Sequence, residues 1–219
     1  MGGTTKLSYL FATGLLLVAA SLIPLTASAG TGVFGSYVGI DNGGGNAWYG
    51  ANQPGPTTLW AFDGADLGDF TVGDSVLLSG GELLTWKSDG GDVTGANLYY
   101  SVYADGSSAG SFNQVGINWT SNSAFNDAAG NNFVGGGDQK WSTMTSAPNL
   151  LSGLGAGDYN LAVYFMANTN EGDRYDSNGG NNYIAEFSVS EPSPAVPEPA
   201  SAMLLIAAVL PLALLRRRR

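Results

Sequence analysis

Tyr159-Asn-Leu-Ala-Val-Tyr-Phe-Met-Ala167 shows the clearest alternation of apolar and other side chains in the chain. Alternate side chains of a β-strand point to opposite faces of a sheet. One face of this stretch therefore carries Leu161, Val163 and Phe165 together with both end residues. The opposite face carries the remaining side chains, which are Asn160, Ala162, Tyr164 and Met166. This alternation predicts a strand that covers a core with one of its faces.

Two further segments show the same period of two. Residues 96–104 place Leu98, Tyr100 and Val102 on one face, and residues 183–189 place four apolar side chains inward. Weaker strand candidates are Val33–Ile40, Leu59–Phe62, Ser75–Leu78, Leu83–Lys87, Phe112–Trp119 and Lys140–Met144. Together these segments give about nine expected strands.

Turn residues separate the expected strands, and none of the body shows a convincing helical period. Residues 146–154 are expected to form one helical turn at most. Hairpin turns are expected at Asn42-Gly43, Asp63-Gly64, Asp105-Gly106 and Asn178-Gly179, because Asn, Asp and Gly tolerate positive φ. The pattern predicts an all-β protein, an antiparallel β-sandwich of jelly-roll or immunoglobulin-like type, in one domain over residues 30–190.

Charge and composition exclude several classes of function. The chain of 219 residues has 18 acidic and 8 basic residues, no His and no Cys. Residues 30–198 hold all the acidic residues but only Lys87, Lys140 and Arg174 among the basic ones, a net charge of −15. Such a surface repels nucleic acid. The lack of His and Cys excludes catalytic triads, disulfides and thiolate sites, and leaves calcium as the expected metal if one binds.

The N-terminus has the pattern of a signal peptide over residues 1–29. Lys6 precedes an apolar stretch over residues 7–23, and Ala27-Ser28-Ala29 then gives the small-x-small pattern that signal peptidase cleaves. We therefore expect Gly30 to be the first mature residue. The alternative is an uncleaved N-terminal membrane helix.

The C-terminus combines a stiff spacer, an apolar segment and a basic cluster. Residues 191–199 are rich in proline and are expected to be extended. Residues 200–215 hold no charge and would span about 24 Å as a helix, short for a bilayer core of about 30 Å. Arg216, Arg217, Arg218 and Arg219 follow, and the positive-inside rule places them in the cytoplasm. The sequence therefore predicts a transmembrane helix with the β-rich domain outside the cytoplasm.

Val196, Pro197, Glu198 and Pro199, followed by this apolar segment and the terminal arginines, resemble the PEP-CTERM sorting signal of exported bacterial proteins. The resemblance implies processing near Pro-Glu-Pro by an exosortase, which releases or transfers the protein. It also implies a Gram-negative host that makes extracellular polysaccharide, and a protein that is membrane-anchored before it reaches the cell surface or the medium. The alternative is a plain anchor that is never cut.

Parts of the body resemble a β-sandwich module of secreted bacterial proteins, which often accompanies hydrolases. The resemblance rests on residues 92–100, 137–141, 149–153 and 178–183. It implies no catalytic residues. Paired carboxylates can make a glycosidase, but nothing in the sequence selects one pair, so we expect no enzymatic activity.

The densest polar cluster is the segment from Asn168 to Asn182. Its candidate calcium ligands are Glu171, Asp173, Asp176 and Asn178. The spacing is not that of an EF-hand, and the alternative is an ordinary polar hairpin loop. For the acidic residues at 63, 66, 69, 89 and 92, turn chemistry is the expected role.

Aromatic side chains are the second group of candidate binding residues. Trp48 and Tyr49 lie in a segment rich in Gly and Asn, and they are the candidate ligand-binding residues because rings stack on sugars. Trp60, Trp86 and Trp141 are expected in the core. The sequence thus predicts an exported structural or adhesive protein of the cell surface or biofilm matrix. The alternative is a carbohydrate-binding module that acts on extracellular polysaccharide.

Overall fold

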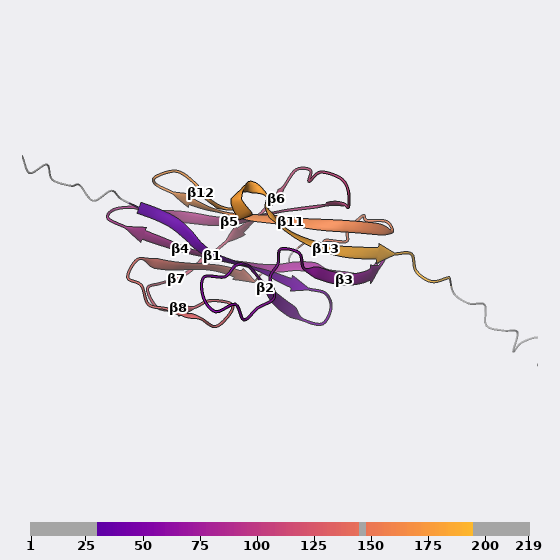
Figure 1. The fold of residues 1–219 in the computed structure, drawn as a ribbon, viewed down its shortest axis with the longest axis horizontal. Coiled ribbons are helices and arrows are strands. Elements are labelled where there is room, and N and C mark those ends of the chain that lie inside the picture. Colours follow the sequence, from indigo (N-terminus) through magenta and orange to yellow (C-terminus); the bar gives the residue numbers. More distant parts are fainter. Residues whose placement is uncertain (1–29, 145–147, 195–219) are drawn as a thin grey trace, which may run out of the picture.

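The structure, a computed structural model, describes residues 30–144 and 148–194 (Figure 1). The predicted signal peptide with Ala27 and Ala29, the Pro-Glu-Pro motif, the apolar segment and the terminal arginines all lie outside the described residues. Within the described ranges no helix is long and apolar enough to cross a membrane. Thirteen strands and one 3₁₀ turn, η1 (Asn178–Gly180), make up the regular structure of that part.

A five-stranded antiparallel sheet forms one layer of the molecule. Its strand order is β2 (Asn46–Asn52), β1 (Gly30–Asp41), β4 (Leu77–Ser88), β10 (Asp138–Met144) and β7 (Trp119–Asn122). The predicted turn at Asn42-Gly43 joins β1 to β2 as a hairpin. Gly43 and Gly45 have positive φ there, and their N–H groups donate to Asp41 Oδ1.

A six-stranded sheet forms the other layer. Its strand order is β3 (Asp66–Thr71), β13 (Tyr183–Ser190), β11 (Gly157–Thr169), β5 (Val93–Ala104) and β6 (Asn113–Ile117), and β12 (Arg174–Asp176) also pairs with β11. All pairs in this sheet are antiparallel except β13 with β3. The parallel pair arises because the segment after β2 crosses the side of the molecule before β3 begins.

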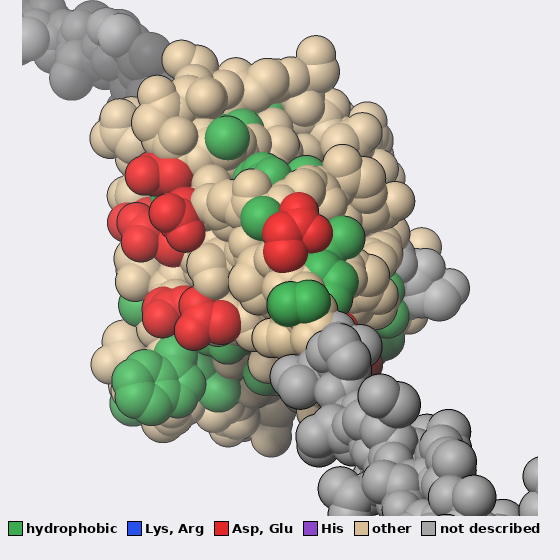
Figure 2. Space-filling view, turned by 90° about the vertical axis from the view of Figure 1, so that its right-hand side faces the viewer, with side chains coloured by type: hydrophobic (Ala, Val, Ile, Leu, Met, Phe, Trp, Pro, Cys, Tyr) green, Lys and Arg blue, Asp and Glu red, His purple; other side chains and the backbone are tan. Residues whose placement is uncertain are grey.

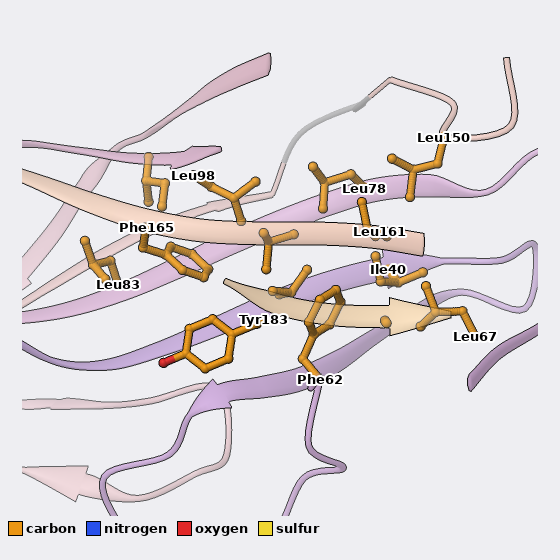
Figure 3. Close-up of a cluster of buried hydrophobic side chains, with 14 of the residues drawn as sticks. Ile40, Phe62, Leu67, Leu78, Leu83, Leu98, Leu150, Leu161, Phe165 and Tyr183 are labelled. Carbon is orange, nitrogen blue, oxygen red and sulfur yellow. The ribbon is translucent and has the colours of Figure 1, made fainter. Parts of the chain in front are cut away.

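The two sheets pack face to face around one hydrophobic core (Figures 1 and 3). The predicted inward face of β11 is confirmed, since Leu161, Val163 and Phe165 are fully buried. Val38 of β1 and Leu83 of β4 enter the same core from the other sheet. The protein is therefore all-β, with two mainly antiparallel sheets arranged as in a β-sandwich.

A second, smaller core lies outside this sandwich. The short hairpin of β8 (Phe125–Asn126) and β9 (Asn132–Phe133) brings Phe125 onto Tyr37 of β1 and Leu84 of β4. Both faces of the middle of the five-stranded sheet are therefore covered. This explains why Tyr37 and Leu84, which alternate with residues of the main core, are also fully buried.

Several strand boundaries differ from the sequence-based expectation. The candidates Ser75–Leu78 and Leu83–Lys87 merge into the single strand β4, which begins at Leu77 and continues through Gly80. The neighbouring strand β10 approaches closely at Gly80. A Cβ atom at Gly80 would lie 2.7 Å from the carbonyl oxygen of Thr143 on β10. Residues 112–119 contribute β6 and β7 to different sheets, with a break at Asn118. The candidate Leu59–Phe62 is wrong as a strand and makes only an isolated bridge from Ala61 to Gly50.

Five strands have no counterpart among the sequence-based expectations: β2, β3, β8, β9 and β12. These strands are short or interrupted by Gly, so their alternation is weak. Part of the expected helical turn over residues 146–154 lies outside the described residues. The rest contains hydrogen-bonded turns, with Ser152 N–H donating to Asn149 O and Leu154 N–H donating to Leu151 O.

Candidate functional site

An exposed tryptophan marks the side of the molecule where the edges of the two sheets meet. The segment between β2 and β3 is fixed to β2, since Gly50 N–H donates to Trp60 O and Phe62 N–H donates to Gly50 O, both at 2.9 Å. Phe62 is fully buried in the core, whereas Trp60 is 83% exposed. The expectation that Trp60 fills the core is therefore wrong. The anchored backbone holds its ring outside the sandwich.

Trp60 borders a hollow of about 530 Å³. The hollow is lined by Tyr49, Trp60, Ala61, Asp63, Gly64, Ala65 and Asp66, and we call it the Trp60 groove. Tyr49 is half-buried, and its ring meets Phe62 edge to face with centroids 6.2 Å apart. The core thus supports one aromatic wall of the groove, while the other projects into solvent.

Two carboxylates of the groove are held by hydrogen bonds. Asp63 accepts from Ile184 N–H at 2.9 Å and from the side-chain amide of Asn178 at 3.0 Å. Asp66 Oδ1 accepts from Gly68 N–H at 2.8 Å. The predicted turn at Asp63-Gly64 is present, with Gly64 at φ 76°, but it leads into a strand parallel to β13 and does not form a hairpin.

A second hollow of about 330 Å³ adjoins the groove and shares Asp66 with it. We call it the acidic hollow, because five carboxylates line it: Asp66, Asp69, Asp105, Asp158 and Glu186. They come from neighbouring elements of the six-stranded sheet, where Glu186 pairs with Asp66 and Ser188 pairs with Asp69. Figure 2 shows acidic side chains gathered among hydrophobic ones at this end of the molecule.

The basic side chains of the described part pair with other carboxylates. Lys87 contacts Asp92 at 2.7 Å, Lys140 contacts Glu82 at 2.8 Å, and Arg174 contacts Glu171 at 3.4 Å. Glu82 and Asp92 show opposite pKa shifts. Burial raises the pKa of the Glu82 carboxyl, whereas the hydrogen bond from Lys87 lowers the pKa of Asp92. Among residues 30–144 and 148–194, no basic side chain therefore pairs with the carboxylates of the Trp60 groove or of the acidic hollow.

The structure separates the two predicted ligand-binding residues of β2. Tyr49 lines the Trp60 groove, but Trp48 packs against the smaller core outside the five-stranded sheet. Adjacent strand residues point to opposite faces, so the two rings do not form one platform. Trp60 takes the place of Trp48 beside Tyr49. The preceding Pro54-Gly55-Pro56 is the sequence signal for a loop that would have indicated an exposed Trp60.

The other tryptophans divide between core and surface. Trp141 is 6% exposed, as predicted, and its indole N–H donates to Thr85 Oγ1 at 3.1 Å. Trp86 is 38% exposed, so the expectation that it fills the core is wrong. Its ring lies over the neighbouring strand β1, where a Cβ atom at Gly32 would come 2.3 Å from the indole nitrogen. The missing side chain of Gly32 provides the space for Trp86 on the outside of the sheet.

The segment from Asn168 to Asn182 does not gather its predicted calcium ligands. Asp176 is buried and accepts from Ser36 Oγ at 2.7 Å and from the Tyr183 hydroxyl, as part of strand β12. Each of the other three has its own partner: Glu171 pairs with Arg174, Asp173 with Asn168, and Asn178 with Asp63. Within residues 30–144 and 148–194 no group of three or more acidic side chains is placed to hold a metal. Asp176 and Asn178 connect this segment to Ser36 and Asp63, while Arg174 and Asn168, which pair with Glu171 and Asp173, lie within the segment itself.

Comparisons with known proteins add no relative. No protein-family model matches the chain, and no curated protein matches it.

Proposed function

We propose that this protein is an exported, non-catalytic component of the cell surface or biofilm matrix that adheres to extracellular polysaccharide through the Trp60 groove. The observation that carries the proposal is the 83% exposure of Trp60 beside the half-buried ring of Tyr49. The C–H face of a sugar ring matches an apolar aromatic face, and carboxylates can accept hydrogen bonds from sugar hydroxyls. An open hollow of about 530 Å³ has room for sugar rings beside Trp60.

The acidic residues support binding better than hydrolysis. A glycosidase needs a carboxyl group that stays protonated long enough to act as general acid. Burial raises the pKa of the Glu82 carboxyl, but Glu82 lies beneath the β8–β9 hairpin and is 2% exposed. In the groove, Asp63 is held by two protein donors and supports the backbone at Ile184. We therefore propose that the groove binds polysaccharide without cleaving it.

Binding to insoluble polysaccharide tests this function. The purified full-length chain should co-sediment with an insoluble polysaccharide. Trp60→Ala should bind that polysaccharide more weakly, with a loss of about 2 kcal/mol in binding free energy, typical of a central aromatic residue. Trp119→Ala is the matched control, because Trp119 is 55% exposed on β7 and lies outside the groove. Equal binding by the wild type and Trp60→Ala would refute the groove as the binding site.

The proposed export route rests on the terminal sequences. We propose that signal peptidase removes residues 1–29, and that an exosortase cuts near Pro197, Glu198 and Pro199 after the apolar segment has inserted in the membrane of a Gram-negative bacterium. In keeping with this route, β13 ends at Ser190, shortly before the Pro-rich segment that carries the proposed exosortase site. We also propose a jelly-roll or immunoglobulin-like subclass for the sandwich.

Replacing Glu198 by Ala tests the sorting step. The variant should accumulate at full length in the membrane fraction, while the wild type is shortened. The matched control is Glu191→Ala, which removes an acidic residue from the same spacer outside the Pro-Glu-Pro motif. Normal shortening of Glu198→Ala would leave a plain anchor as the explanation of the C-terminus.

A further inference from the structure

The polar groups that line the Trp60 groove are mainly hydrogen-bond acceptors. The carboxylates of Asp63 and Asp66 accept but do not donate when ionised. The backbone N–H groups of Gly64 and Ala65 already donate to Ile184 O at 2.7 Å and to Phe62 O at 3.0 Å. The Tyr49 hydroxyl and the Trp60 indole N–H are the side-chain donors of the lining. A ligand that matches this wall must therefore supply donors.

The charge around the groove favours the same kind of ligand. Asp66 joins the groove to the acidic hollow, where Asp69 and Glu186 lie on the paired strands β3 and β13. Lys87, Lys140 and Arg174 are each engaged with carboxylates elsewhere. Near a protein surface, opposite charges attract and like charges repel, and both effects grow as the charges approach. An anionic glycan is therefore disfavoured here, and a cationic one is favoured.

We propose that the occupant of the Trp60 groove is a glycan whose sugars carry free amines, a glucosamine polymer rather than its N-acetylated, neutral or uronic-acid counterparts. The inference rests on the proposed polysaccharide binding and names its ligand class. A sugar ring stacks on Trp60, and its ammonium group faces Asp66. An ammonium supplies three donors and no acceptor, which complements a wall of carboxylates.

Oligomers of glucosamine and N-acetylglucosamine, equal in length and linkage, test this proposal with the purified full-length chain. They share one backbone and differ in the charge on nitrogen. Titration calorimetry at mildly acidic pH, where the amine of glucosamine is protonated, should show that the glucosamine oligomer binds up to about fivefold more tightly, the upper range of one exposed ion pair. The difference should shrink in 1 M salt, where the Debye length falls to about 3 Å.

Two isosteric variants locate the effect. Asp66→Asn keeps an oxygen for Gly68 N–H and should weaken glucosamine binding by up to about fivefold, with little change for the acetylated oligomer. Asp89→Asn is the matched control. It removes the same charge at an exposed turn residue with φ 50°, a conformation that Asn tolerates, and it does not line the groove. Binding by Asp89→Asn should equal that of the wild type.

The outcomes separate this inference from the proposed function. Equal affinity for the two oligomers, or equal losses in Asp66→Asn and Asp89→Asn, would overturn the amino-sugar proposal. Polysaccharide binding that depends on Trp60, without any binding of the glucosamine oligomer, would also overturn it while leaving the proposed function intact. Failure of every glycan to bind would overturn both.

Discussion

The ion pair between Glu82 and Lys140 lies beneath the β8–β9 hairpin, and Lys140→Met would leave one buried charge without its partner. Glu82 Oε2 lies 2.8 Å from Lys140 Nζ, and the two side chains are 2% and 16% exposed. The other carboxylate oxygen accepts from Ala128 N–H at 2.8 Å. Burial raises the pKa of Glu82, and Lys140 opposes that shift. The loss of stability in Lys140→Met should therefore be largest at pH values at which an unpaired Glu82 would be ionised.

The cost of the substitution follows from the protonation of Glu82. Without Lys140, the folded protein can keep Glu82 neutral instead of burying an unpaired charge. An unfolded glutamate has a pKa of about 4.3, so holding the proton costs about 3.7 kcal/mol at pH 7 and about 1 kcal/mol at pH 5. The value at pH 7 lies in the range of about 3–5 kcal/mol seen when one partner of a buried pair is removed. We expect a loss of about 3.7 kcal/mol at pH 7 and about 1 kcal/mol at pH 5.

The sign of this pH dependence is specific. The folded variant binds a proton at Glu82 that the unfolded chain has released above pH 4.3, roughly the free carboxyl value. The variant therefore gains stability as the pH falls from 7 to 5 and loses it as the pH rises. Glu82→Gln in the Lys140→Met background should recover much of the loss at pH 7, because the amide is neutral and its oxygen can still accept from Ala128 N–H.

Urea unfolding of the full-length chain at pH 5 and pH 7, followed by tryptophan fluorescence, measures these differences. Lys87→Met is the matched control, because Lys87 and Asp92 form a partly exposed pair with 34% and 51% side-chain exposure. Its effect should be much smaller. It should also be the same at both pH values, because the ordinary pKa of an aspartate, about 3.9, already lies below this window with or without the lowering by Lys87. An equal loss at both pH values for Lys140→Met, or a loss below about 1 kcal/mol at pH 7, would show that water reaches Glu82.

Three further predictions concern the core and its buried tyrosines. Val163→Asp should unfold the domain and abolish its β-rich circular dichroism, because it puts an unpaired charge at a fully buried position at a cost of several kcal/mol, whereas Val163→Ile should fold. Tyr37→Phe removes the hydroxyl that donates to buried Asp127 and should cost about 1–3 kcal/mol in urea unfolding, while Tyr175→Phe at an exposed ring should not. Burial raises the pKa of Tyr37 and of Tyr183. The stability of the wild type should therefore fall as the pH rises above about 10, where the tyrosines of the unfolded chain ionise. A stability that stays constant in this pH range would contradict the burial of the two hydroxyl groups.

The strands with the strongest alternation were predictable from the sequence alone. Residues 159–167, 96–104 and 183–189 occur as parts of β11, β5 and β13, with the predicted inward faces. A strand that is apolar on one face has one way to cover a core, so its period fixes its orientation. Trp141 is buried as predicted, although it lies on the weaker candidate Lys140–Met144, which forms part of β10.

The Trp60 groove is formed by tertiary contacts, which local sequence patterns do not reveal. Trp60 is exposed because hydrogen bonds to Gly50 hold its backbone on the side of the molecule. Tyr49 lines the same groove, and its ring rests on the edge of the buried Phe62 ring. The acidic hollow unites residues 66, 69, 105, 158 and 186, which are separated along the chain and meet only through strand pairing.

The all-β class, the direction of the core faces and the strong negative charge of residues 30–198 were predictable without the structure. These properties follow from composition and from a period of two along single strands, which are local quantities. Tertiary contacts determine which tryptophan is exposed. They also determine which partners the carboxylates of the polar loop after β11 have. Those outcomes depend on pairing between distant residues, such as Asp63 with Asn178 and Ser36 with Asp176. These hydrogen bonds can stabilise the fold only once both sheets have formed.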